Sequence, residues 1–86
     1  MPSQPYEVVI LTAQAHDVLD RLTAESREYA IAQLRELSKT VMYLRRTYPH
    51  AHSIHLFDCD RYRGVWYFVD HTLEAIFVVE FLDRPQ

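Results

Sequence analysis

The last third of the chain reads as three consecutive strands, and this pattern limits the fold more than any other feature. Segments rich in β-branched and aromatic residues occur near residues 53–57, 62–69 and 73–82. The connections between them, around residues 59–61 and 70–72, are short enough for hairpins. Hairpin connections join antiparallel neighbours, so we predict a three-stranded antiparallel meander.

The first half of the chain reads as one strand followed by two helices. Residues 6–11 have the composition and length of a strand, and Thr12 offers an N-cap for a helix over residues 13–22. A second helix begins with a cap and an acidic first turn at residues 23–26 and is expected to fray near Arg46. Its apolar residues recur at helical spacing, which predicts packing on a sheet: Ala30, Leu34, Leu37, Val41 and Leu44.

These elements predict an α+β fold in the order β-α-α-β-β-β. The two N-terminal helices would pack on one face of a mainly antiparallel four-stranded sheet, which leaves the opposite face for function. Residues 75–79 are apolar at every position, so the last strand is expected to be central. A chain of 86 residues is long enough for one modest core, and we predict a single domain over residues 1–86.

Several classes of protein are disfavoured by composition. No apolar run approaches the roughly 20 residues of a membrane span, and the N-terminus does not resemble a signal peptide, so a cytoplasmic location is expected. Cys59 is the single cysteine, and its neighbours Asp58 and Asp60 oppose thiolate formation, which predicts a turn residue and not a nucleophile. There is no Gly-rich phosphate cradle, and neither helical nor strand stripe suggests a cofactor, so none is predicted.

Charge is unevenly distributed along the chain. The formal net charge is −3, yet residues 39–63 carry five cationic residues against two aspartates, which gives +3. This segment is either a solvated basic loop or the docking site of an anionic partner. RNA is the obvious candidate for such a partner if aromatic stacking surfaces accompany the cations.

The strand over residues 62–69 combines an arginine with aromatic residues. Period-2 alternation puts Arg63, Val65 and Tyr67 on one face and Trp66 and Phe68 on the other. We expect the face with Arg63 and Tyr67 to be exposed. Trp66 and Phe68 are expected in the core under the helices.

Three histidines lie within six positions, at His50, His52 and His55. Zinc requires ligands held by rigid elements and a fourth partner, whereas two of these histidines fall in an expected loop. The spacing is therefore not diagnostic, and we predict no metal site.

In their order and spacing these features resemble the RelE/ParE superfamily of toxins from bacterial type II toxin–antitoxin systems. The resemblance covers almost the whole chain. It is carried by the opening strand at residues 6–8, the paired helices, residues 54–56 before a turn, residues 61–67 followed by Val69 and Asp70, and the closing residues 81–84. RelE-like members cut messenger RNA in the ribosomal decoding site, whereas ParE-like members inhibit DNA gyrase. A partner antitoxin neutralises both kinds.

The resemblance implies roles for individual residues. Arg63 falls on the strand arginine that holds the scissile phosphate in RelE-like enzymes, and Arg84 falls on the arginine that closes the last strand. His55 lies where RelE has a lysine. With an ordinary pKa of about 6.5, it could accept the proton of the 2′-hydroxyl while Arg63 and Arg84 bind phosphate oxygens. Tyr67 could stack on a base, and Arg45, Arg46 and Arg61 would extend the RNA-binding surface.

Three functions follow, in this order of preference. The first is a ribosome-dependent mRNA endoribonuclease with His55, Arg63 and Arg84 as catalytic residues. The second is a ParE-like gyrase inhibitor without catalysis, favoured by the acidic balance and by an end at Gln86, before the tail that supplies a tyrosine or histidine in many RelE-like members. The third is a non-toxic interaction module. Expected partners are a cognate antitoxin with acidic residues opposing Arg45, Arg46 and Arg61, the ribosome with its mRNA, or gyrase, and a homodimer is possible.

Overall fold

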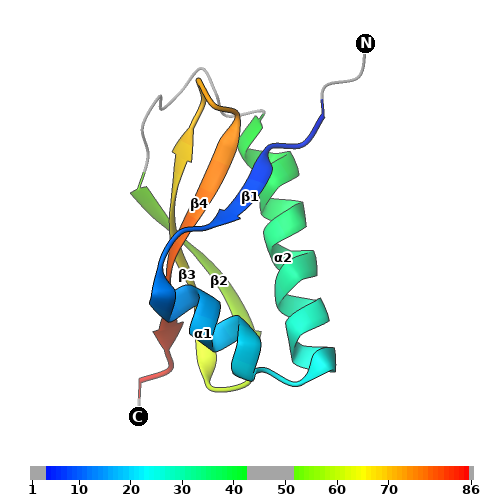
Figure 1. The fold of residues 1–86 in the computed structure, drawn as a ribbon, viewed down its shortest axis with the longest axis vertical. Helices are drawn as coiled ribbons and strands as arrows, with labels where there is room; N and C mark the ends of the chain where they lie inside the picture. Colours follow the sequence, from blue (N-terminus) through cyan, green and yellow to red (C-terminus); the bar gives the residue numbers. More distant parts are fainter. Residues whose placement is uncertain (1–3, 43–51, 86) are drawn as a thin grey trace.

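The computed structural model describes residues 4–42 and 52–85 of the chain (Figure 1). Its elements confirm the predicted order β-α-α-β-β-β and the α+β class. They are β1 (Glu7–Ile10), α1 (Ala13–Arg21), α2 (Ala24–Met42), β2 (His52–Cys59), β3 (Tyr62–Asp70) and β4 (Ala75–Asp83).

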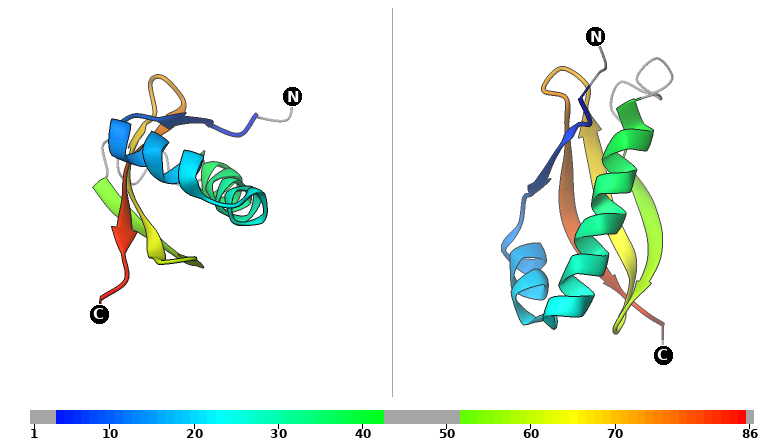
Figure 2. Two further views of the ribbon diagram at one scale, coloured as in Figure 1. Left: turned by 60° about the horizontal axis from the view of Figure 1, so that its bottom comes forward. Right: turned by 90° about the vertical axis from the view of Figure 1, so that its right-hand side faces the viewer.

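The four strands form one mixed sheet in the spatial order β1-β4-β3-β2. The pairs β2–β3 and β3–β4 are antiparallel, as predicted for the meander, and β1 pairs with β4 in parallel. Strand β4 therefore lies in the interior of the sheet, and β1 and β2 are its two edges. Figure 2 shows both helices on the same side of the sheet, with the other side left open.

Polar side chains fix where helix α1 begins. The Thr12 hydroxyl accepts a hydrogen bond from the Ala15 amide at 3.2 Å, which confirms the predicted N-cap, and it donates to the Val79 carbonyl of β4. The Gln14 side chain then bonds to both backbone groups of Phe81, at 3.0 and 3.1 Å. These contacts attach the first turn of α1 to β4 beyond the end of β1.

The core lies between the helices and the sheet. The predicted α2 stripe is buried over its described members Ala30, Leu34, Leu37 and Val41, and α1 contributes Ala15 and Val18. The facing strand residues form two adjoining clusters with them, which are Phe57, Cys59, Val65, Val78 and Phe81 in one, and Tyr67, Val69 and Ile76 with Tyr6 in the other.

The predicted faces of β3 are reversed in the structure. Val65, Tyr67 and Val69 do share a face, but it is the buried one: Tyr67 is only 8% exposed. Trp66 lies on the open face and is 39% exposed, and Phe68 stacks on Phe77 of β4 with ring centroids 4.8 Å apart. The predictions that Tyr67 is exposed and that Trp66 and Phe68 fill the core are therefore wrong. Both faces of β3 carry apolar residues, so alternation groups the residues without identifying the buried group.

An irregularity beside Gly64 separates Arg63 from that alternation. Tyr62 pairs with Asp83 and Gly64 with Leu82, so β3 contains one extra residue at Arg63. Gly64 has a φ of +145°, a conformation that other residues rarely adopt. Tyr62 consequently packs on the same core as Val65, three positions later, while Arg63 is exposed.

Some predictions fall outside the described residues. Arg45, Arg46 and His50 are among them, as are Leu44 and the end of the second helix near Arg46. Within residues 4–42 and 52–85, no helix is long and apolar enough to cross a membrane.

Candidate functional site

The two arginines with the strongest predicted roles meet at one end of the sheet. Arg63 lines a hollow of about 350 Å³ together with Leu56, Phe57 and Asp58. Arg84, just after β4, places its guanidinium 3.3 Å from the Asp58 carboxylate. The β2–β3 turn and the end of β4 thus bring Arg63 and Arg84 to opposite flanks of Asp58, at the lower end of the molecule in Figure 1.

We call this region the hairpin end and define it by its charged residues, which are Asp58, Asp60, Arg61, Arg63, Asp83 and Arg84. Arg61 forms an ion pair with Asp83 at 3.3 Å, and its guanidinium lies 5.7 Å from the centre of the Tyr62 ring. The amide of Arg84 also donates to the Arg61 carbonyl at 3.0 Å. Three arginines therefore face three aspartates, so the local charge balances to zero. In the described part of the chain, Arg63 is the one arginine of this group whose side chain forms neither an ion pair nor a hydrogen bond.

His55 lies on the other side of the sheet. It pairs with Val65 in the β2–β3 ladder, and its ring packs against the buried Phe57, with centroids 5.7 Å apart. Its Nε2 atom is buried and has no hydrogen-bond partner, and desolvation lowers the pKa of the imidazole below its usual 6.5. The structure therefore does not bring His55 together with Arg63 and Arg84.

Burial of His55 predicts a pH-dependent stability. Because the folded state holds a proton less tightly than the unfolded state, the free energy of unfolding should fall as pH drops below about 6.5. In urea titrations from pH 7.5 to 5, we expect His55→Leu to flatten this dependence and to add about 1 kcal/mol at pH 7.5, because an orphaned buried nitrogen is removed. If the dependence of unfolding free energy on pH were unaltered in His55→Leu, the pH dependence could not be attributed to His55.

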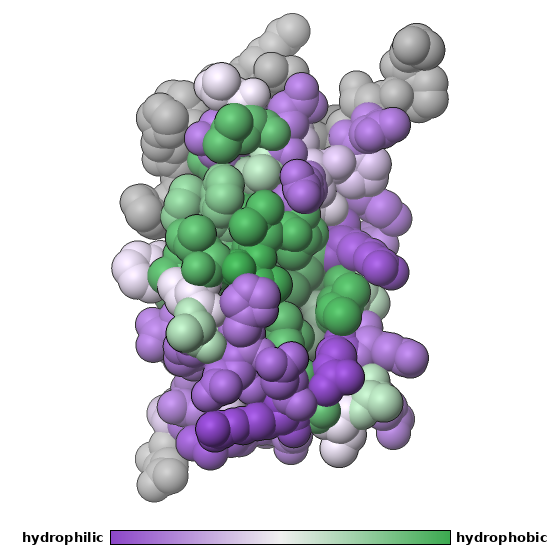
Figure 3. All heavy atoms as spheres, in the orientation of Figure 1, coloured by the Kyte–Doolittle hydropathy of each residue, from purple (hydrophilic) through white to green (hydrophobic). Residues whose placement is uncertain are grey.

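A second concave region lies between β1 and α2. It has a volume of about 690 Å³, and its walls include Tyr6, Val8, Ile10 and Leu34. In the space-filling view, apolar side chains gather in a band over β1 and the adjoining strand, with hydrophilic side chains over the helices around them (Figure 3). We call the concave region between β1 and α2 the β1–α2 groove.

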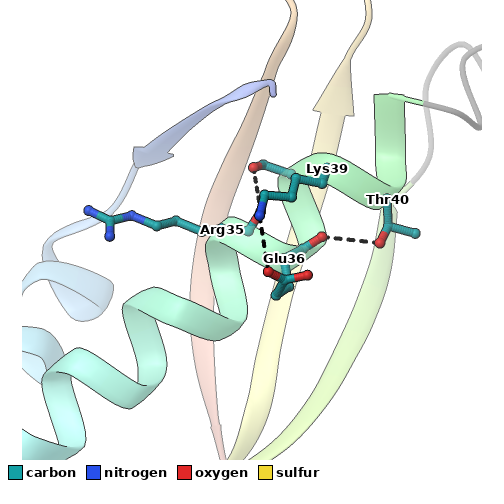
Figure 4. A network of polar contacts seen from close by, with 5 residues as sticks. Arg35, Glu36, Lys39 and Thr40 are labelled. Carbon is teal, nitrogen blue, oxygen red and sulfur yellow. Dashed lines mark hydrogen bonds and ion pairs between the residues drawn. The ribbon is translucent and has the colours of Figure 1, made fainter. Parts of the chain in front are cut away.

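The helical rim of the β1–α2 groove is charged. Lys39 is neutralised by Glu36 at 3.2 Å, one turn earlier on α2. Figure 4 shows Arg35 extended away from this pair toward β1 and the start of α1. Arg35 forms no ion pair with any described residue, so it presents a cation over an apolar surface.

The sequence did not identify the most exposed apolar side chains of the sheet. Ile54 and Leu56 of β2 are 51% and 67% exposed on the open face. Both fall in a predicted strand, and the absence of charge between residues 53 and 57 is the sequence signal for an edge that can pair with another strand.

Metal ligation receives no support from the described residues. They contain no group of three or more His, Cys, Asp or Glu side chains arranged to hold an ion. Cys59 is buried near the Ser26 carbonyl, and burial together with Asp60 raises its thiol pKa, which makes it a poor nucleophile.

No family model, curated protein or solved structure matches this chain.

Proposed function

We propose that this chain is a RelE/ParE-like toxin that inhibits its target by binding, in the manner of ParE-like inhibitors of DNA gyrase. The proposal combines the sequence resemblance with one structural observation, which is that His55 packs beside the buried Phe57, whereas Arg84 pairs with Asp58 on the other face of β2. This observation supports a binding function over RNA cleavage.

Cleavage of RNA by its own 2′-hydroxyl requires a base and phosphate-binding cations around a single phosphate. A general base must approach its proton to about 2.6–3.2 Å, directly or through one water. His55 packs on Phe57 under the helices, whereas Arg63 and Arg84 flank Asp58 on the open side. We infer from these positions that one phosphate would not contact the imidazole and both arginines at once. Tyr67, the proposed stacking residue, is buried in the core and offers no surface to a base.

Electrostatics at the hairpin end also favour a protein target. Nucleic-acid affinity comes largely from an excess of cations that neutralise phosphates. Arg61 and Arg84 are instead paired with Asp83 and Asp58. Alternating charges beside the apolar Leu56 resemble the polar rim of a protein–protein interface. Arg63, exposed and unpaired among the described residues, is the cation best able to contact an acidic group of the target.

The ribonuclease remains the second candidate, because Arg63 lines the same hollow as Asp58, the carboxylate that Arg84 pairs with. Both arginines would reach a phosphate that displaced Asp58. In that case the base would have to come from a group other than His55.

For the neutralising partner we propose an acidic amphipathic segment of an antitoxin bound in the β1–α2 groove. Its apolar residues would cover Val8 and Ile10, and an acidic residue would pair with Arg35. Of the cations predicted to oppose the antitoxin, Arg61 is already paired with Asp83. If an adjacent small reading frame restores growth on co-expression, Arg35→Glu should weaken this rescue and Arg21→Glu on α1 should not.

The toxin proposal is tested by a short pulse of expression in a bacterial host. Growth, DNA-damage signalling and new mRNA 5′ ends are measured for the wild type, Arg63→Glu, His55→Leu and the control Arg21→Ala. We expect growth arrest with DNA-damage signalling and intact mRNA. Arg63→Glu should relieve the arrest at least tenfold in surviving colonies, for a lost contact of about 1.4 kcal/mol or more. His55→Leu and Arg21→Ala should arrest growth like the wild type.

The alternative outcomes separate the remaining functions. New 5′ ends inside translated codons that disappear with Arg63→Glu would overturn the binding proposal in favour of the ribonuclease. Loss of toxicity in a folded His55→Leu variant would do the same. Normal growth at wild-type expression levels would indicate a non-toxic interaction module.

A further inference from the structure

The exposed apolar side chains of this protein concentrate along one edge of the sheet. Among the described residues, six large apolar side chains are exposed: Leu11, Tyr29, Ile54, Leu56, Trp66 and Leu73. Four of these six border β2. Ile54 and Leu56 belong to the strand, Trp66 pairs with Ile54, and Tyr29 of α2 contacts Phe57 with ring centroids 6.3 Å apart. Apolar groups gathered in this way usually mark an interaction site.

Strand β2 is also an unprotected edge. Its inner side pairs with β3, and no described strand pairs with its outer side. The right-hand view of Figure 2 shows β2 along one margin of the sheet. Edge strands usually avoid pairing with other chains by carrying lysine or proline or by being very short. Residues 53–57 carry neither a charge nor a proline, and β2 has 8 residues. The irregularity of β2 lies between Leu56 and Cys59, so the regular stretch over residues 53–56 precedes it.

We propose that two copies of this chain associate by antiparallel pairing of their β2 strands about a two-fold axis at His55. Residues directly opposite each other in an antiparallel pair lie on the same face. With the axis at His55, Ile54 of one copy lies opposite Leu56 of the other, and the two-fold axis repeats this apolar contact. The sheets of the two copies then form one continuous sheet of eight strands.

The chemistry of the strand selects this register over its neighbours. Shifting one β2 strand by a single residue relative to the other would place open-face residues opposite helix-side residues. The allowed symmetric registers therefore have the two-fold axis at a residue, and neighbouring registers move that axis to the adjacent residue. An axis at Leu56 would place Ile54 opposite the exposed Asp58, an apolar group against a carboxylate. An axis at Ile54 would remove the Ile54–Leu56 contact. The axis at His55 is the one that pairs the two most exposed apolar residues of β2.

Size sets the expected strength of the dimer. Five paired residues span about 17 Å of strand, which is short compared with the interfaces of obligate dimers. We expect a dissociation constant in the micromolar range and a monomer–dimer equilibrium that depends on concentration. The association rests on β2 alone and is independent of the proposed toxin activity.

Mass measurement by light scattering over a concentration series tests the association. The wild type should rise from 10.2 kDa toward twice that mass, while Leu56→Lys should weaken association at least tenfold. Leu73→Lys is the matched control, because Leu73 is 65% exposed in the β3–β4 turn and the added charge is the same. Circular dichroism verifies that both variants are folded. A wild type that stays monomeric up to millimolar concentration would overturn the proposal and leave this edge for a strand of another protein.

Cross-linking tests the register separately. Ile54→Cys and Leu56→Cys, mixed and oxidised, should form a disulfide between the two variants, because opposed residues have Cβ atoms about 5 Å apart. Each variant alone should cross-link at least tenfold less, since its own cysteines lie diagonally, about 7–8 Å apart. Equal cross-linking of either variant alone would overturn the register. Dimers that Leu56→Lys leaves intact would overturn the choice of β2.

Discussion

Replacing Gly64 with alanine is expected to prevent stable folding, although it adds one methyl group. A Cβ at this position would collide with the His55 carbonyl oxygen and lie 3.0 Å from the Leu56 Cα, both on the backbone of β2. The φ of +145° is unfavourable for alanine even without this collision. Backbone atoms of a paired strand cannot move aside as a flexible side chain can, so β2 would have to separate from β3.

We expect this substitution to lower the free energy of unfolding by about 4 kcal/mol or more, a large part of the 5–15 kcal/mol typical of a domain. Urea titration followed by circular dichroism measures the loss. Arg63→Ala is the control, because it changes the neighbouring exposed residue and should cost within about 0.5 kcal/mol. A loss below about 1 kcal/mol in Gly64→Ala would contradict the described approach of β2 to β3.

The fold could be predicted from local patterns because each element carries its own signal. The apolar stripe of α2, the Thr12 cap and the short hairpin connections are all readable within a few residues, and all three are confirmed. The boundaries differ by one or two residues, as with β1, predicted over residues 6–11 and observed as Glu7–Ile10. Such differences do not change the topology.

The faces of β3 could not be predicted because neither side of this strand is polar. Alternation predicts an exposed Tyr67 because this residue has the same parity as the charged Arg63, and parity fails across the extra residue beside Gly64. Val65, Tyr67 and Val69 pack under the helices, whereas Trp66 lies on the open side. The choice depends on the space that α1 and α2 leave above the sheet. Sequence spacing contains no information about that space.

The charge of the candidate site could not be predicted for a different reason. Residues 39–63 carry a local excess of positive charge, but Arg61 is neutralised by Asp83, which is 22 positions away in the sequence. Arg84, read as a cation for phosphate, pairs with Asp58 of β2. Both pairs are exposed and individually weak, yet together they remove the net charge that RNA binding requires. Counting charges along the chain therefore overestimates the basic character of this end.

Phe81→Ala is expected to give the second-largest loss of stability and to test which face of the sheet is buried. Phe81 is 2% exposed, and its ring meets that of Tyr62 edge-on with centroids 5.7 Å apart. It belongs to the cluster that joins β4 to Val18 and Leu34 of the two helices. Removing the ring leaves a cavity that these rigid elements cannot close, so we expect a loss of about 3–5 kcal/mol.

The matched control is Phe77→Ala, the same substitution on the same strand. Phe77 is half-buried on the open face, where it stacks on Phe68. Its truncation exposes a smaller surface and leaves no enclosed cavity, so we expect a loss of about 1–2 kcal/mol. Urea titration of both variants gives the comparison. Equal losses of unfolding free energy in Phe81→Ala and Phe77→Ala would mean that the face turned away from the helices is as well covered as the core. The proposed binding function requires that face to be open, so this result would also contradict that function.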